Sequence, residues 1–188
     1  MIIGLTGYFG AGKGEIGEYL KTKGFIYHSC SDYLRGELEK LGQPKTIENL
    51  ITLGNSLRSQ FGAGIIPKRL LEQIEAKGEK LVIVDSLRHP DEIAALREGG
   101  DFVLVSVDAP IELRYQRIKE RGRPGDQMTY EEFCKQEEFQ ITGQGSQAQL
   151  LASRKLADYN IVNDGTIDEL HTKIDDVLKD VGLGDLVK

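Results

Sequence analysis

The first candidate site is a glycine-rich loop close to the N-terminus. Gly7, Gly12 and Lys13 fit the phosphate-loop pattern G-x-x-x-x-G-K, although Gly14 stands where Ser or Thr is usual. Glycines let the backbone turn its N–H groups inward, and a following helix adds free N–H groups and a positive dipole end. Lys13 supplies a mobile charge for the outer phosphates of a nucleotide. Because an apolar stretch precedes the loop and helical periodicity follows it, we favour a phosphate site over a chance glycine-rich turn.

A carboxylate ends a second apolar stretch, Val-Ile-Val-Asp85. Such a residue either helps to hold Mg²⁺ beside a phosphate loop or simply caps a helix or loop, and the presence of the phosphate loop favours magnesium. Since Gly14 lacks a hydroxyl, the ion would rely on phosphate oxygens and water, with Asp85 acting through water. Gly14 also argues against GTPases, and the chain contains no Asn-Lys-x-Asp motif for reading a guanine base.

Three arginines follow segments that should leave the same edge of a sheet: Arg35, Arg58 and Arg88. Each can bind a phosphate through two parallel hydrogen bonds. A lone surface arginine is usually only solvated, but three arginines in such segments favour shared phosphate binding. We therefore predict that they bind the phosphate of an acceptor.

A strongly basic segment lies further along the chain. Arg114, Arg117 and Arg121 recur at spacings of three and four residues, so they should share one helical face. Like charges at this spacing repel unless an anion joins them. This favours a clamp in which Arg117, Arg121 and Arg123 stabilise a transferring phosphoryl group, over a merely solvated basic face. The polar, glycine-containing stretch that follows predicts a lid over about residues 122–145 that excludes water.

Composition argues against several other classes. The net charge of −6 over 188 residues disfavours a nucleic-acid binder. The two cysteines, Cys30 and Cys134, give no disulfide framework and fit a reducing cytosol. No signal peptide or membrane-length apolar run is visible, so we expect a cytoplasmic protein without a membrane partner. The three histidines are scattered, which argues against a zinc site.

The elements that must position these residues alternate along the chain. Strands are expected over Ile2–Thr6, Phe25–His28, Lys80–Asp85, Phe102–Val107 and Tyr159–Val162. Helices are expected over Lys13–Lys23, from a cap at Ser31 or Asp32 to Leu41, from a cap at Thr46 to Phe61, and over Pro67–Lys77, Pro90–Gly99, Pro110–Gly122, Glu131–Gln140, Gln147–Leu156 and Asp168–Leu178. This alternation predicts a three-layer α/β/α fold with a five-stranded, mostly parallel sheet. Ligands of such sheets bind beyond the carboxyl ends of the strands, where the loop, Asp32 and Asp85 would converge.

Together these motifs resemble those of the P-loop nucleoside monophosphate kinases, over nearly the whole chain. Gly7-x-x-Gly10-Ala11-Gly12-Lys13-Gly14 resembles the adenylate-kinase loop, in which Gly does follow Lys. Asp32-Tyr-Leu-Arg35 and Asp85-Ser-Leu-Arg88 are similar to adenylate-kinase segments whose Arg binds the acceptor phosphate, the second Asp lying near magnesium. Arg117-Ile-x-x-Arg121 resembles the pair that opens and closes over the phosphates.

The end of the chain resembles a related family. Ala157-Asp-Tyr-x-Ile-x-Asn163-Asp164-Gly165 looks like the ending of dephospho-CoA kinases, where the loop after the last strand packs against the donor adenine. In overall texture the chain is most similar to small archaeal nucleotide-kinase-like and dephospho-CoA-kinase-like proteins. It departs from adenylate kinases at Glu15, where they carry Thr or Ser. Between Arg123 and the last expected strand it offers as cations only Lys135, Arg154 and Lys155.

We therefore expect a single P-loop kinase domain over residues 1–188, with an acceptor-binding helical insert at about 31–78. With Mg²⁺ it would move the γ-phosphoryl group of ATP to a small nucleotide-like acceptor. The expected ATP-binding residues are Gly7, Gly10, Ala11, Gly12, Lys13, Gly14, Glu15, Asn163 and Gly165. The expected acceptor-binding residues are Asp32, Arg35, Arg58 and Arg88, with Asp85 for the metal and Lys13, Arg117, Arg121 and Arg123 as catalytic residues.

Two other interpretations stay open: a nucleotide-binding regulatory or adaptor module that has lost transfer, and an ATPase that drives a partner. The acceptor is open between a nucleoside or deoxynucleoside monophosphate and a hydroxyl acceptor such as dephospho-CoA. A phosphate acceptor is already ionised near neutral pH, whereas a hydroxyl needs a base, for which Asp32 is the candidate. The choice between ATP and GTP and the oligomeric state are open as well.

Overall fold

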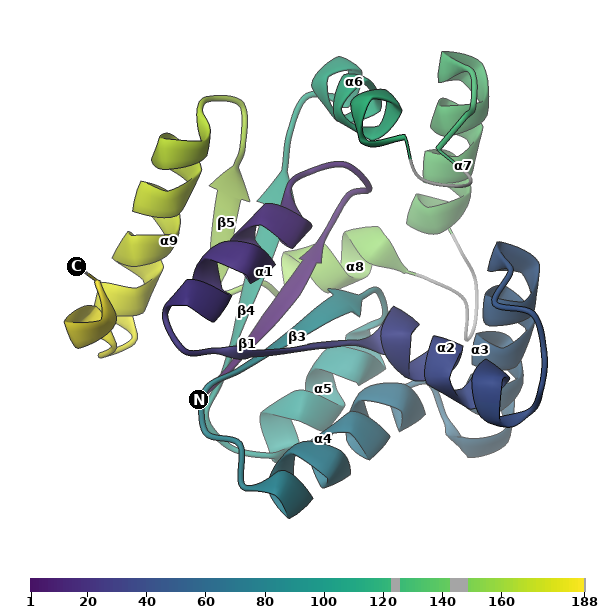
Figure 1. The fold of residues 1–188 in the computed structure, drawn as a ribbon, viewed down its shortest axis with the longest axis horizontal. Coiled ribbons are helices and arrows are strands. Elements are labelled where there is room, and N and C mark those ends of the chain that lie inside the picture. Colours follow the sequence, from purple (N-terminus) through teal and green to yellow (C-terminus); the bar gives the residue numbers. More distant parts are fainter. Residues whose placement is uncertain (123–125, 143–148, 188) are drawn as a thin grey trace.

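The computed structural model describes residues 1–122, 126–142 and 149–187, which are arranged around a central sheet (Figure 1). The sheet has five strands in the spatial order β2-β3-β1-β4-β5, and every neighbouring pair is parallel. The strands are β1 (Ile2–Gly7), β2 (Ile26–Ser29), β3 (Val82–Leu87), β4 (Phe102–Asp108) and β5 (Tyr159–Val162). The predicted three-layer α/β fold with a five-stranded, mostly parallel sheet is confirmed.

Helices cover both faces of the sheet. They are α1 (Lys13–Thr22), α2 (Cys30–Lys40), α3 (Ile47–Phe61), α4 (Ile65–Lys77), α5 (Pro90–Glu98), α6 (Ile111–Arg121), α7 (Tyr130–Thr142), α8 (Leu150–Lys155) and α9 (Ile167–Asp180), followed by the 3₁₀ turn η1 (Gly184–Leu186). Helices α1 and α9 pack on one face, and α2, α4 and α5 on the other. Helices α6 and α7 lie beyond the carboxyl ends of the strands, next to the loop that joins β1 to α1 (Figure 1).

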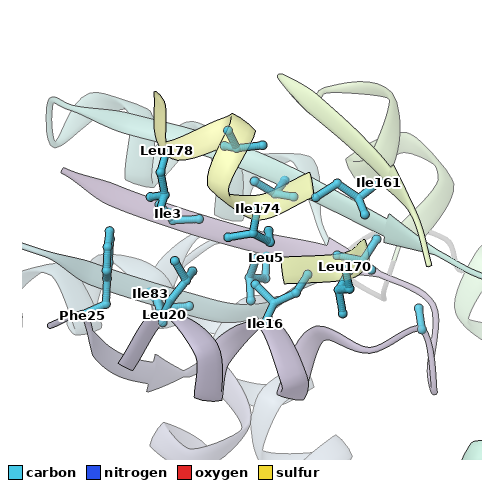
Figure 2. Packing of buried hydrophobic residues seen from close by; sticks show 14 residues of the cluster. Ile3, Leu5, Ile16, Leu20, Phe25, Ile83, Ile161, Leu170, Ile174 and Leu178 are labelled. Carbon is cyan, nitrogen blue, oxygen red and sulfur yellow. The ribbon is translucent and has the colours of Figure 1, made fainter. Parts of the chain in front are cut away.

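Strand β1 lies in the middle of the sheet, and its side chains alternate between two cores. Ile3 and Leu5 belong to the core under α1 and α9, where Figure 2 shows them with Ile16 of α1 and Ile174 of α9. Ile2 belongs to the other core, with residues of β3, α4 and α5. Burying one such side chain contributes about 1.5–3 kcal/mol. This two-sided burial holds the stem of the glycine-rich loop in place.

Local hydrogen bonds decide where two of the helices begin. Helix α2 begins at Cys30 because the Ser29 hydroxyl accepts the N–H groups of Ser31 and Asp32, at 3.2 and 3.4 Å. The cap predicted at Ser31 or Asp32 is therefore wrong. Thr46 caps α3 as predicted, since its hydroxyl accepts a backbone N–H of the first turn.

Other boundaries shift by a few residues. Helix α4 begins at Ile65, with Pro67 in its first turn rather than at its start. Strand β3 runs to Leu87, two residues beyond Asp85, where the sequence predicted its end. The predicted start of α8 at Gln147 falls outside the described residues. In the described part of the chain, no helix is both long enough and apolar enough to cross a membrane.

Candidate active site

The phosphate loop joins β1 to α1 at the carboxyl edge of the sheet (Figure 1). Gly7 and Gly12 have φ angles of 134° and 107°, and a Cβ atom there would lie 2.0 Å from Val107 O and 2.2 Å from Asn163 Nδ2. Position 14 differs, because outside its chain neighbours and its own helix backbone no described atom lies within 4 Å of the place where a Gly14 Cβ would be. Close packing therefore requires glycine at positions 7 and 12, whereas crowding does not explain the missing hydroxyl at position 14.

Lys13 folds back over the loop from the first turn of α1. Its Nζ donates to the carbonyl oxygens of Gly7 and Tyr8, at 2.9 Å each. Burial lowers the pKa of Lys13 to about 8; Asp85 opposes this, and neighbouring arginines, Arg88 first among them, lower the pKa further. The loop thus holds a desolvated amine beside the N-terminal N–H groups of α1, which is the arrangement that an incoming phosphate stabilises.

A β-bulge lies at Asp85, in the strand that pairs with β1. Strand β3 pairs with β1, but the register shifts so that β3 carries one extra residue at Asp85 and Ser86. Beyond the bulge, the Thr6 hydroxyl donates to Leu87 O at 2.7 Å. Ser86 has a φ angle of 70°, which residues other than glycine rarely adopt. Backbone strain is therefore located directly beside the candidate metal carboxylate.

Ser86→Gly should raise the free energy of unfolding by about 0.5–1 kcal/mol. A positive φ costs a non-glycine residue about 1–2 kcal/mol, and the greater freedom of glycine in the unfolded chain offsets part of this gain. Ser86→Ala is the matched control, because it removes the hydroxyl and keeps the strain. Urea unfolding of the three proteins measures the difference, and a glycine variant no more stable than the alanine variant would contradict the assignment of strain.

Asp85 is buried, and both of its carboxylate oxygens accept hydrogen bonds. The Tyr27 hydroxyl donates to Oδ2 at 2.6 Å, and the Ser86 N–H donates to Oδ1 at 2.5 Å. Burial, followed by the charge of Asp85, holds the pKa of Tyr27 well above its ordinary value, so the phenol is the donor. The described residues contain no cluster of three His, Cys, Asp or Glu that could hold a metal by itself. Asp85 therefore fits a Mg²⁺ whose ligands are phosphate oxygens and water, with the carboxylate contacting the ion through water.

The three arginines predicted to bind the acceptor lie in different surroundings. Arg35 pairs with Asp32 at 2.5 Å on the exposed face of α2. Arg58 pairs with Glu92 of α5 at 3.0 Å. The Arg88 guanidinium is half-buried, and burial lowers its pKa, yet it makes no hydrogen bond or ion pair with any described residue. Of the three, Arg88 is the one whose guanidinium is free to meet a phosphate.

Glu92, which the sequence did not single out, holds the segment that carries Arg88. Its side chain is 0% exposed. Oε1 accepts from Arg58 Nε and Nη2 at 3.3 and 3.0 Å, and Oε2 accepts from the N–H groups of Arg88 and His89 at 2.8 and 3.2 Å. A single buried carboxylate therefore connects α3, α5 and the turn after β3.

A pocket of about 270 Å³ opens beside α2, in the segment predicted to bind the acceptor. It lies between β2, α2 and α4, and Tyr27 forms part of its wall. Its other lining residues are His28, Ser29, Asp32, Tyr33, Gly36, Glu37, Lys40, Leu70 and Gln73. Two of its carboxylates are already paired, Glu37 with Lys40 and Asp32 with Arg35. The pocket therefore suits a neutral polar group better than a phosphate.

Arg114 does not share an open basic face with its neighbours on α6, contrary to the prediction. It is buried and forms an ion pair with Glu137 of α7 through two hydrogen bonds. Its guanidinium also donates to Ala109 O at 2.8 Å and to Phe9 O at 3.4 Å. Arg114 therefore connects α6, α7 and the phosphate loop.

Two further arginines of this segment, Arg117 and Arg121, also have partners within the protein. Arg121 donates to both carboxylate oxygens of Asp126, at 2.9 and 2.7 Å. Arg117 donates to Asn163 O at 3.0 Å, and burial lowers its pKa. Arg123 lies outside the described residues. The anion that joins Arg121 is thus a carboxylate of the protein itself, which a substrate phosphate would have to replace.

Arg154 of α8 also reaches the loop. Its guanidinium lies over the Tyr8 ring, 4.2 Å from the centroid, and Arg114 approaches the same ring at 4.6 Å. Arg154 Nη2 donates to Asp108 Oδ2 at 2.7 Å. The sequence marked Arg154 only as one of the few cations after the lid, because nothing local connects it to a loop far away in the chain.

The residues expected near the donor nucleotide divide into two groups. Asn163 is buried, and its Nδ2 donates to Ala11 O at 2.9 Å, so it supports the loop. Glu15 instead pairs with His171 of α9 at 3.0 Å. Gly165 is exposed, and a Cβ there would lie 1.9 Å from a carboxylate oxygen of α9. Of Asn163, Glu15 and Gly165, Asn163 is the residue that donates a hydrogen bond to the loop.

Two solved structures of similar fold place this architecture among known proteins. TT1252 from Thermus thermophilus has a TM-score of 0.64 at 20% identity, covering 96% of this chain and 97% of that one. Shikimate kinase from Bacteroides thetaiotaomicron has a TM-score of 0.63 at 18% identity, covering 95% and 98%. At this level of identity the likeness concerns the fold, which is the P-loop kinase fold.

Sequence relatives cover nearly the whole chain. The UPF0200 protein of Sulfurisphaera tokodaii is 35% identical over 180 residues, covering 95% of this chain and 96% of the relative. The UPF0200 protein of Hyperthermus butylicus is 33% identical over 173 residues, covering 92% and 90%. A family model described as AAA domain matches residues 3–140. With its phosphate loop, its parallel sheet and these matches, the chain belongs to the AAA domain family of P-loop proteins and to the UPF0200 proteins.

Proposed function

We propose that this protein is a kinase that uses Mg²⁺ and ATP to phosphorylate a small, nucleotide-like acceptor that already carries a phosphate. One observation carries the proposal: Lys13 in the loop after β1, the buried Asp85 near the end of β3, and Arg88 just after β3 lie at the carboxyl ends of neighbouring strands, and the Arg88 guanidinium has no ion-pair partner among the described residues. The first two suit a nucleotide donor with its metal. Arg88 is then an additional cation, and an acceptor phosphate would satisfy it.

On the donor side, the loop N–H groups and Lys13 would hold the β- and γ-phosphates. Asn163 would support the loop through Ala11. Mg²⁺, when bound, would neutralise charge on these phosphates, and Asp85 would contact it through water. Glu15 and Gly165 would act indirectly, since both lie against α9.

On the acceptor side, Arg88 would bind the phosphate, and the pocket beside Tyr27 would take an uncharged part of the molecule. Asp32 lines this pocket and pairs with Arg35, and an acceptor would open that ion pair. Arg58 would act through Glu92, by fixing the turn that carries Arg88. Within a single kinase domain of residues 1–188, the helices at about 31–78 would form the acceptor-binding insert.

In the reaction, an oxygen of the acceptor phosphate would attack the γ-phosphorus while the bond to the β-phosphate oxygen breaks, so that ADP leaves. An ionised phosphate needs no general base. Arg117, Arg121 and Arg123 would stabilise the transferring group once the lid at about 122–145 closes. Arg121 would exchange Asp126 for phosphate in that step.

The test is ADP release from Mg-ATP with a panel of acceptors. The panel holds ribo- and deoxynucleoside monophosphates, with dephospho-CoA and shikimate as hydroxyl acceptors. We expect at least one monophosphate to raise ADP release well above the rate with ATP alone. Equal release with and without every acceptor indicates an ATPase, and nucleotide binding without release indicates a regulatory or adaptor module. Either result overturns the kinase proposal.

Arg88→Gln should lower kcat/KM for the acceptor by about 10²–10³-fold, because it removes the charge that meets the acceptor phosphate. Arg97→Gln is the matched control, since Arg97 lies on the exposed face of α5 and pairs with Asp158. The control should behave as the wild type. Equal kinetics for the two variants would remove Arg88 from the acceptor site.

A further inference from the structure

Tyr27 connects the edge strand β2 to the candidate metal carboxylate. Its hydroxyl donates to Asp85 Oδ2 at 2.6 Å. Its ring packs on α1 at Gly17, where a Cβ atom would lie 2.8 Å from the ring, and Lys21 Nζ lies 5.0 Å from the ring centroid. The phenol is therefore held between β2 and the helix that begins with Lys13.

Among the described residues, the hydrogen bond from Tyr27 is one of two that set the orientation of the Asp85 carboxylate. The other comes from the Ser86 N–H at the bulge, and it goes to Oδ1. An ionised carboxylate offers about four acceptor positions, so free positions remain on both oxygens for water. Because each oxygen is tied to a different neighbour, the plane of the carboxylate is fixed before any ligand arrives.

Tyr27 also belongs to the wall of the 270 Å³ pocket on the acceptor side, together with Ser29 and Asp32. It therefore separates the space suited to the acceptor from the carboxylate suited to the metal. A tyrosine in a short strand carries no sequence signal for such a place, and none of the motifs described above includes it.

We infer that Tyr27 is a positioning residue that orients Asp85 toward the metal of the metal–nucleotide complex. This inference rests on the proposed function in one respect, since it requires Mg-ATP at the loop. Hydrogen-bond partners behind the groups that serve a metal typically contribute 10–100-fold to metal affinity. Without the hydroxyl, Asp85 keeps one of its two orienting donors, and part of the Mg²⁺ contribution to ATP binding is lost.

The experiment compares Tyr27→Phe with Tyr19→Phe. Both remove a tyrosine hydroxyl that donates to an aspartate at 2.6 Å, but the partner of Tyr19 is Asp175 of α9, away from the loop. Isothermal titration calorimetry gives the Kd of ATP with Mg²⁺ and with EDTA for each protein. Tyr27→Phe should reduce the Mg²⁺-dependent gain in affinity about tenfold and leave the metal-free Kd unchanged. Tyr19→Phe should match the wild type in both.

Three outcomes overturn the inference: a wild-type ratio of the two Kd values in Tyr27→Phe, an equal loss with and without Mg²⁺, or a wild-type protein whose ATP affinity does not respond to Mg²⁺. Asp85→Asn provides a second check. If Tyr27 acts through Asp85, Tyr27→Phe has no further effect on the ratio in that background. These measurements report binding and not phosphoryl transfer. If the protein binds Mg-ATP but transfers no phosphoryl group, the kinase proposal fails, whereas the ratio of the two Kd values still tests the role of Tyr27.

Discussion

Replacing Arg58 with methionine should lower the free energy of unfolding by about 3–5 kcal/mol. The reason is Glu92, whose side chain is 0% exposed and whose ion-pair partner is Arg58. Without that partner, a carboxylate would stay buried with two backbone N–H groups as its remaining hydrogen-bond donors. In a domain of this size, the loss corresponds to a fall in melting temperature of about 6–20 °C. Urea unfolding followed by circular dichroism measures it.

Arg97→Met is the matched control for this change, because its ion pair with Asp158 has both side chains 41% exposed. Such a pair contributes about 0–1 kcal/mol. The double variant Arg58→Met with Glu92→Met should recover part of the lost stability, since it removes both charges but leaves the Arg88 and His89 N–H groups without their acceptor. If Arg58→Met were as stable as Arg97→Met, the buried ion pair would be absent in solution, and Arg58 would be available to an acceptor.

The affinity for ATP should fall about twofold between about pH 7 and 8 and about tenfold by pH 9. Burial lowers the pKa of Lys13 to about 8, so the free protein loses this charge above that pH. Phosphates favour the charged amine and return its pKa toward the ordinary value for lysine. Above pH 8, binding must therefore take up a proton, which weakens it as pH rises. Calorimetric titrations with ATP across this range measure the profile.

Lys13→Arg separates this effect from general alkaline changes. A guanidinium stays charged throughout the range, so the ATP affinity of this variant should be independent of pH up to pH 9. Lys13→Met should instead bind ATP weakly at every pH. A wild-type profile as flat as that of Lys13→Arg would show that the amine keeps its charge in the free loop, and the assigned pKa would then be wrong.

The parts of the site that the sequence predicts are those with a local signature. The loop shows its glycines and lysine within seven residues, and Asp85 ends a continuous apolar stretch. Continuous hydrophobicity in β3 and β4 identifies strands buried on both faces, and the alternation of strands with helices determines the layers. Each of these signals depends on residues that are neighbours in the chain, so it can be recognised in a single sequence.

The groups that connect different elements carry no such signature. Tyr27 lies 58 residues from Asp85, and Arg58 lies 34 residues from Glu92. Spacing on α6 predicts that Arg114 shares a face with Arg117, but a carboxylate 23 residues away on α7 pairs with it in the interior. The bulge at Ser86 depends on how β3 meets β1, which no pattern within β3 expresses. Such contacts depend on packing between elements, so they became visible only in the structure.

The order of the strands gives the two halves of the site unequal stiffness. Strand β1, which carries the phosphate loop, has ladder hydrogen bonds to β3 on one side and β4 on the other. Strand β2, which leads into the acceptor-side helix α2, pairs with β3 alone. Displacing β1 would break two ladders of hydrogen bonds, whereas displacing β2 would break one. The fold thus holds the proposed nucleotide site firmly and leaves the proposed acceptor site easier to displace.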